Sequence, residues 1–251
     1  MGFFIDVLAI GEAEKIGGLG KIALISNGQF KIAGNPRQLT THLGRVMPDL
    51  KLASLPAQDA APAMADMNSP LLTVIETTHT PEVMPAPQIE PLKLDDAEVN
   101  DIRAKPVAIE LILDVSGSMA GSIEHKRKIQ IAREALKETL TGLTDPIFFV
   151  GLRAYGFDKN VPKTKKDSCP NTELLTAIRP NNLRNIRQYA YQLEPYGYTP
   201  IARSLLLAGA DLKEIEAENR MIILITDGEE TCDGDPIATA KTLCEMGINL
   251  E

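Results

Sequence analysis

Apolar runs alternate with amphipathic stretches over the second half of the chain. Residues 107–113, 148–155 and 221–226 are mostly apolar, which is typical of strands buried on both faces. Residues 126–141, 183–193 and 201–212 repeat apolar positions every three to four residues, as amphipathic helices do. A short edge strand is expected over 172–178, and a last helix from Asp235-Pro236 to Gly247. The pattern predicts an α/β fold with a mostly parallel sheet covered by helices.

The first 105 residues do not share this alternation. Residues 1–52 are expected to form a small segment with a strand over 3–10 and a β-hairpin, because Asn27-Gly28 separates two apolar runs and is typical of a type I′ turn. The glycines over 17–20 lack the spacing of a nucleotide-binding loop and are interpreted as a turn. Residues 53–106 hold eight of the 17 prolines, so a Pro/Ala-rich linker is predicted over 53–105, with one short strand at 71–75. The α/β domain is then predicted over 106–251.

Composition limits the classes of partner. The 251 residues carry a net charge of −8 with a pI of about 5.1, which argues against binding to nucleic acid or an anionic membrane through a basic face. No stretch has the roughly 18 apolar residues of a membrane span. The first residues lack the basic start and long apolar core of a signal peptide. Either the protein is cytoplasmic, or its true start lies upstream.

Polar residues follow the apolar runs where a parallel sheet would end. Asp114, Ser116 and Ser118 occupy alternate positions after the first run, and alternate residues of an extended chain share a side. One carboxylate with neutral oxygens suits a hard divalent cation. Thr199 precedes a predicted helix, and Asp227 follows the third run. Taken singly, these residues would more often cap a helix or form a turn than bind a metal.

Together the five positions resemble the von Willebrand factor A (vWA) family. Its metal-ion-dependent adhesion site consists of D-x-S-x-S, a distant Thr and a later Asp, and Asp114, Ser116, Ser118, Thr199 and Asp227 match these in order. The segments Y-G-Y-T-P-I-A-R-S-L and I-L-I-T-D-G-E-E-T-C-D-G-D-P are most similar to bacterial vWA proteins of the calcium-activated chloride channel type. The resemblance covers about residues 105–251.

The resemblance implies a fold and a set of metal ligands. The sheet is expected to be doubly wound with strand order 3-2-1-4-5-6, which makes Asp114 and Asp227 neighbours at the point where the winding reverses. Ser116, Ser118 and Thr199 would bind Mg²⁺ (or Mn²⁺ or Ca²⁺) directly, and Asp114 and Asp227 mainly through water. The chain ends where the family's fifth strand begins, so the last strands are expected to be missing and one sheet edge open.

Three cysteines occur, at 169, 232 and 244, and none forms a C-x-x-C pair. They are either ordinary thiols or include a disulfide. The resemblance favours a Cys169–Cys232 disulfide, because related bacterial sequences carry paired cysteines in these loops. Those sequences often have a further Cys where Ile237 stands here.

Three functions are compared. The family resemblance favours a non-enzymatic adhesion module that binds an Asp or Glu of a protein partner through the metal, in the periplasm or at the cell surface. The absence of a signal peptide favours an intracellular vWA subunit of an ATPase or chelatase complex. A metal-assisted phosphohydrolase is less favoured, because Ser116 stands where D-x-D needs an aspartate. The chain has no H-E-x-x-H or G-x-S-x-G motif.

Overall fold

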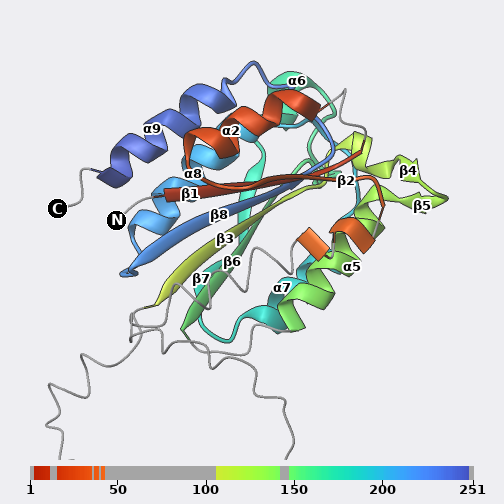
Figure 1. Ribbon diagram of the computed structural model, residues 1–251. Helices are drawn as coiled ribbons and strands as arrows, with labels where there is room; N and C mark the ends of the chain where they lie inside the picture. The colour runs from red at the N-terminus through yellow and green to blue at the C-terminus, as the bar shows by residue number, and fades with distance from the viewer. Residues whose placement is uncertain are drawn as a thin grey trace, which may run out of the picture. The chain divides into compact units, whose positions relative to one another are not determined.

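Six strands form one sheet in the part of the chain that the computed structural model describes, residues 3–11, 16–35, 37–39, 41–42, 106–141 and 147–248 (Figure 1). In sheet order they are β2 (Phe30–Ala33), β1 (Phe3–Ile10), β8 (Asn219–Thr226), β3 (Val107–Asp114), β6 (Phe148–Tyr155) and β7 (Thr172–Arg179). Only the β6–β7 pair among them is antiparallel. The predicted α/β fold with a mostly parallel sheet is confirmed.

Helices cover both faces of this sheet (Figure 1). One layer contains α5 (Lys128–Thr141) and α7 (Leu183–Gln192), and the other contains α2 (Gly20–Ile25), α8 (Ile201–Lys213) and α9 (Pro236–Ile248). Successive residues of β3 alternate between the two cores, with Ile109 in the α5 layer and Ile112 in the α8 layer. Full burial of such a side chain contributes roughly 1.5–3 kcal/mol.

The edge of β8 that was expected to be open is covered by the N-terminal strand. β1 pairs in parallel with β8 from Phe3–Arg220 to Ala9–Thr226, and β2 pairs in parallel with β1. Counted from β3, the positions of the fifth and sixth strands of the 3-2-1-4-5-6 order are therefore filled by β1 and β2. The expectations of an open edge and of missing strands are wrong for the sheet, because residues from the start of the chain complete it.

The predicted β-hairpin around Asn27-Gly28 is also wrong. Residues 20–25 form α2, and β2 pairs with β1 rather than with the residues before the turn. Asn27 has a positive φ of 54°, but Gly28 lies so close to β1 that an added Cβ would be 2.1 Å from the Ile5 carbonyl oxygen. The glycine allows this close approach, and α2 buries its own Ile22 and Ala23, so packing favours a helix over a strand here.

Other expectations differ in detail or fall on residues that are not described. A 3-10 turn, η1 (Gly17–Leu19), leads into α2 where a simple turn was expected. α9 ends at Ile248, one residue beyond the glycine predicted to end it. The linker over 53–105 and its short strand lie outside the described residues. The boundaries at 52 and 105 therefore stay predictions.

A cluster of charged side chains, of which Glu110 and Arg153 are buried, lies between the sheet and α8. Glu110 of β3 is fully buried, and one of its carboxylate oxygens accepts a 2.7 Å hydrogen bond from Nε of Arg153. Arg153, on β6, also pairs with Asp211 of α8. Burial raises the pKa of Glu110 to about 7, although the Arg153 charge opposes the shift. The cluster links α8 to two central strands, and α8 begins directly after the loop that carries Thr199.

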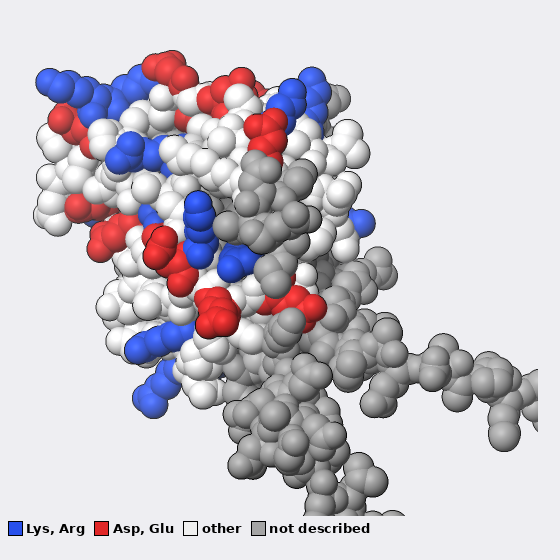
Figure 2. All heavy atoms as spheres, turned by 90° about the vertical axis from the view of Figure 1, so that its left-hand side faces the viewer, with Lys and Arg blue, Asp and Glu red and all other residues white. Residues whose placement is uncertain are grey.

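The end of the molecule where β1 begins carries charges of both signs. Figure 2 shows acidic and basic side chains interspersed over the described part of this face.

No described helix is long and apolar enough to cross a membrane.

Candidate metal-binding site

Asp114 and Asp227 lie together at the carboxyl edge of the sheet. Asp114 is the last residue of β3, Asp227 directly follows β8, and these two strands are paired up to Leu113–Ile225. The site therefore forms at a topological switch point, where ligands of open α/β sheets bind. The structure places the two carboxylates as neighbours, although 112 residues separate them in the sequence.

Asp114 is the most buried group of the site, with 0 % of its surface exposed. Its Oδ1 accepts a 2.8 Å hydrogen bond from the Ser116 amide, and its Oδ2 accepts a 2.5 Å bond from the Thr226 hydroxyl. Burial, together with the nearby charge of Asp227, raises the pKa of this carboxyl to about 6. The Tyr155 hydroxyl is buried beside it, and its pKa is raised by burial and by the Asp114 charge. This arrangement favours a nearby positive charge.

The two serine hydroxyls lie between the carboxylates. Ser116 Oγ and Ser118 Oγ are 3.0 Å apart, and Ser118 Oγ donates a 2.7 Å hydrogen bond to Oδ1 of Asp227. These serines flank the start of η2 (Gly117–Ala120), a 3-10 turn that directs the chain away from the strand end. The sequence prediction that Asp114, Ser116 and Ser118 converge on one region agrees with these contacts.

Thr199 lies on the adjacent loop and is 4 % exposed. Its amide donates a 2.8 Å hydrogen bond to the Thr231 hydroxyl, and its carbonyl accepts a 3.1 Å bond from the Thr231 amide. The loop is joined to the serine turn through Gly117, whose amide donates to the Gly197 carbonyl at 3.0 Å. Within the described structure, the Thr199 hydroxyl is not hydrogen-bonded to the other four predicted ligands.

Close packing and a disulfide hold these loops against one another. Gly156 has a φ of +71°, and an added Cβ would be 2.8 Å from the Ser116 backbone. Cys169 and Cys232 form a disulfide that joins the loop after β6 to the loop after β8. Ser168, beside the first cysteine, accepts a 2.9 Å hydrogen bond from the Tyr198 amide. The disulfide thus links two segments that both contact the backbone next to Thr199.

The loop after Asp227 also organises the start of α8. The side chain of Glu230 accepts hydrogen bonds from the Ala202 amide at 2.8 Å and from the Cys232 amide at 2.7 Å. Glu230 therefore satisfies an otherwise free amide in the first turn of the helix. The acidic pair 229–230 is visible in the sequence, but only the folded loops show that Glu230 has this role.

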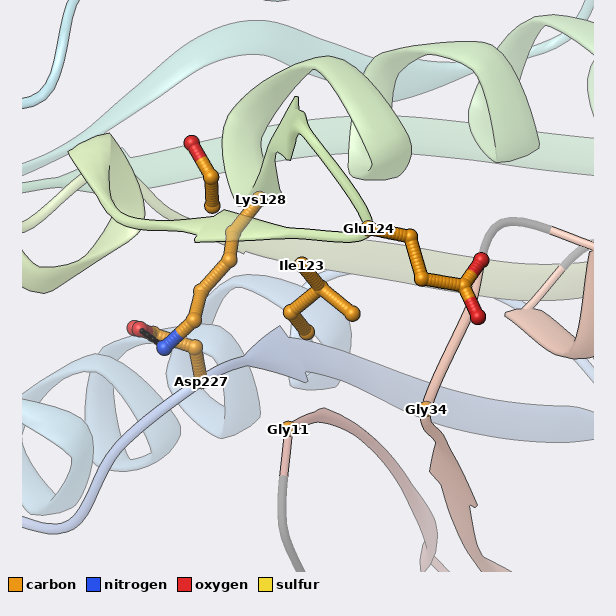
Figure 3. Close-up of a pocket in the computed structure, with 7 residues that line it drawn as sticks. Gly11, Gly34, Ile123, Glu124, Lys128 and Asp227 are labelled. Atoms are coloured by element: carbon orange, nitrogen blue, oxygen red, sulfur yellow. Dashed lines mark hydrogen bonds and ion pairs between the residues drawn. The ribbon is translucent and has the colours of Figure 1, made fainter.

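Lys128 is a site residue that sequence reasoning missed. Its Nζ lies 2.6 Å from Oδ2 of Asp227, and Figure 3 shows the lysine side chain reaching this carboxylate. It is the first residue of α5 and follows a small hairpin of β4 (Ser122–Ile123) and β5 (Lys126–Arg127), which was not predicted. The pocket beside it has a volume of about 520 Å³ and is lined by Gly11, Gly34, Ser122, Ile123, Glu124, Lys128 and Asp227. In the sequence, Lys128 resembles the other basic residues around it, and only the fold brings it to Asp227.

The donor set fits a small, hard cation. Mg²⁺ prefers octahedral coordination at about 2.0–2.1 Å, so two neighbouring ligands lie about 3.0 Å apart. The 3.0 Å between the hydroxyl oxygens of Ser116 and Ser118 matches this spacing. No group of three or more His, Cys, Asp or Glu side chains within the described ranges is arranged to hold a metal. A cation at this site would depend on hydroxyl oxygens together with the two carboxylates.

Comparisons with known proteins give relatives in bacteria. The chain is 31 % identical to the uncharacterized protein YwmC of Bacillus subtilis (strain 168) over 157 residues, which are 61 % of this chain and 69 % of that protein. It is 33 % identical to YwmD of the same organism over 143 residues, or 56 % of this chain and 63 % of that protein.

Two solved structures are similar to part of the chain. The von Willebrand factor domain of the type V pili tip protein Mfa5 from Porphyromonas gingivalis has a TM-score of 0.40 and 18 % identity, covering 50 % of this chain and 39 % of that one. The pilus adhesin SpaC from Lactobacillus rhamnosus GG has a TM-score of 0.40 and 26 % identity, covering 51 % of this chain and 16 % of that one.

Residues 109–230 match the sequence model of the von Willebrand factor type A domain. Because residues 109–230 match this model, the chain contains a von Willebrand factor type A domain.

Proposed function

We propose that the chain is a protein-binding module that depends on a divalent metal ion, Mg²⁺ or alternatively Mn²⁺ or Ca²⁺. The observation that carries this proposal is the pair of hydroxyls, Ser116 and Ser118, 3.0 Å apart beside two buried carboxylates. The spacing suits neighbouring positions of an octahedral ion, and the carboxylates supply compensating negative charge. We assign no catalytic residue and propose a non-enzymatic role.

Each residue of the predicted site has a distinct role in this proposal. Ser116, Ser118 and Thr199 would provide neutral oxygen ligands, as the family resemblance implies. Asp114 and Asp227 would hold the ion mainly through water, and their own hydrogen bonds fix their orientation. When bound, the ion would supply a positive charge that attracts a carboxylate of a partner protein. The partner is therefore expected to present an Asp or Glu side chain.

Metal binding can be tested by thermal unfolding of the whole chain. Free Mg²⁺ or Mn²⁺ at about 100 times its Kd is expected to stabilise the wild-type protein by roughly 2.7 kcal/mol relative to chelator. Ser118→Ala removes a ligand at an exposed position, and Asp114→Ala removes a buried carboxylate, so both variants should lose this gain. Glu229→Ala, an exposed change in the same loop as Asp227, should keep it. Equal melting temperatures of the wild type in metal and in chelator would refute the metal site.

The nature of the partner needs a separate experiment. Random peptides displayed on phage would be selected on the immobilised protein in Mg²⁺ and eluted with chelator. Asp and Glu should be enriched among the eluted peptides and not among peptides retained by the Ser118→Ala variant. Metal-dependent peptides without acidic enrichment would contradict the proposed carboxylate recognition while leaving the metal site intact.

A further inference from the structure

Lys128 lies outside the metal-ligand set that the family resemblance predicts, yet it contacts that set directly. Its ammonium nitrogen is 2.6 Å from Oδ2 of Asp227, whose side chain is 0 % exposed. The other oxygen of Asp227 accepts the Ser118 hydroxyl at 2.7 Å. Both oxygens of this buried carboxylate are therefore partnered within the protein itself.

The local backbone holds Lys128 over the site. Its amide donates a 2.8 Å hydrogen bond to the Gly121 carbonyl, and the Gly121 amide donates a 2.9 Å bond to the Ser118 carbonyl. Between them, the β4–β5 hairpin reverses the chain through Glu124 and His125, which both have positive φ values, 48° and 66°. The turn that carries Ser118 thus also places the start of the lysine side chain.

The charges at the site suggest what this lysine does. Asp114 and Asp227 are buried and contribute two negative charges, of which Lys128 compensates one. A divalent ion alone would bring the sum to zero, whereas an ion together with Lys128 would leave one positive charge. In a poorly solvated site, opposite charges a few ångströms apart attract strongly and like charges repel strongly. The lysine is therefore attracted to Asp227 and would be repelled by a bound ion.

We propose that the Lys128 ammonium is a built-in counter-ion of the metal site, which neutralises Asp227 when no ion is bound and competes with the divalent ion for that carboxylate. This inference rests on the proposed function. It means that Lys128 weakens metal binding and keeps the metal-free domain stable. With the ion bound, the lysine adds positive charge beside the position that would take the partner carboxylate.

The pocket next to Asp227 gives the lysine a place to turn when an ion arrives. Figure 3 shows the Lys128 side chain reaching across to Asp227, and Ile123, Glu124 and Gly11 all lie to the right of it in this view. Glu124 is exposed and offers a carboxylate on the wall of the same pocket. Displacement from Asp227 would therefore leave the ammonium within a pocket that carries the Glu124 carboxylate.

Calorimetric titration with Mg²⁺ or Mn²⁺ alone tests the proposal. Lys128→Met keeps much of the side-chain length without the charge, and it should bind the ion at least tenfold more tightly than the wild type, which is about 1.4 kcal/mol. Lys128→Arg keeps the charge and should bind like the wild type. Lys126→Met is the matched control, because Lys126 pairs with Glu134 rather than with the site. In chelator, only Lys128→Met should melt at a lower temperature, since the buried Asp227 carboxylate loses its positively charged partner and keeps only the Ser118 hydroxyl.

The outcomes separate this inference from the proposed function. Unchanged metal affinity or weaker binding in Lys128→Met, with normal binding by the wild type, would overturn the counter-ion role and leave the metal-dependent module standing. Absence of binding in the wild type and in Lys128→Met would overturn both. Binding by Lys128→Met but not by the wild type would support competition by the lysine but would overturn the proposed metal dependence of the wild-type chain.

Discussion

Removal of the Cys169–Cys232 disulfide is expected to destabilise the protein and to loosen the backbone around Thr199. The change is the double substitution Cys169→Ser/Cys232→Ser, or reduction of the wild type with dithiothreitol. The disulfide links positions 63 residues apart in the sequence. In the metal-free protein, its loss should therefore act mainly by freeing a long loop in the unfolded chain.

The size of the effect follows from the length of that loop. The chain-entropy relation gives a stabilisation of about 4 kcal/mol for a loop of 63 residues. For a domain of this size each kcal/mol shifts the melting temperature by about 2–4 °C, so a decrease of roughly 8–16 °C is expected. Cys244→Ser is the control, because this thiol is not paired and should change the melting temperature little.

Hydrogen exchange measured in chelator adds a local test. The amides of Tyr198 and Thr199 donate to Ser168 and Thr231, each of which is next to one of the paired cysteines. Both amides should exchange faster in the double variant, relative to amides of β3. If the melting temperature falls by less than about 2 °C and the exchange of these amides is unchanged, the disulfide does not stabilise the backbone around Thr199.

Three further predictions concern the scaffold. Gly156→Ala should destabilise the protein by at least about 2 kcal/mol in denaturant unfolding, because φ is +71° and the new Cβ would lie 2.8 Å from the Ser116 backbone. Gly228→Ala should cost far less, because its new Cβ would lie 3.8 Å from the nearest atom, Ser118 Oγ. Equal costs would contradict this steric account. Burial raises the pKa of the Glu110 carboxyl from 4.5 to about 7, so its contribution to stability is present below pH 4.5 and is lost as the pH rises through 7. Urea unfolding should therefore show that the free energy of unfolding decreases by up to about 3 kcal/mol between pH 5 and 8, and Glu110→Gln should remove this decrease. The same pH dependence of the unfolding free energy in both proteins would contradict the prediction. Leu8→Ala should cost about 2–5 kcal/mol in the same assay, since the side chain is fully buried; a cost below 1 kcal/mol would mean that β1 is not part of the folded sheet in solution.

The strands and helices between 107 and 226 could be predicted because their signals are local. A mostly apolar run indicates a buried strand, and a 3.6-residue period indicates a helix, whatever lies next to them. The proximity of most of the proposed metal ligands could be predicted for a related reason. Asp114, Ser116 and Ser118 follow one strand closely, and Asp227 ends another, so the expected topology was enough to bring them together.

The sequence predictions that failed depend on contacts between residues far apart in the chain, which a local sequence pattern does not specify. Phe3–Ile10 was recognised as a strand, but one of its two partners, β8, is more than 200 residues away, and an apolar run does not specify its neighbours. Asn27-Gly28 has the sequence of a hairpin turn, yet packing of α2 and the approach of Gly28 to β1 determine the local fold. Lys128 depends on the path of a two-residue hairpin turn, and the sequence around it shows only charged residues.

The position of β1 has a consequence for the covalent chain. The strands of the sheet come from two stretches, residues 3–42 and 106–248, whose covalent connection is the peptide chain between them, because the disulfide lies within the second stretch. A single proteolytic cut between 43 and 105 would leave two fragments whose pairing along β1 and β8 is noncovalent. The protein can therefore be treated as a split domain: the two fragments, produced separately and mixed, should reconstitute the sheet and with it the carboxyl edge that holds Asp114 and Asp227.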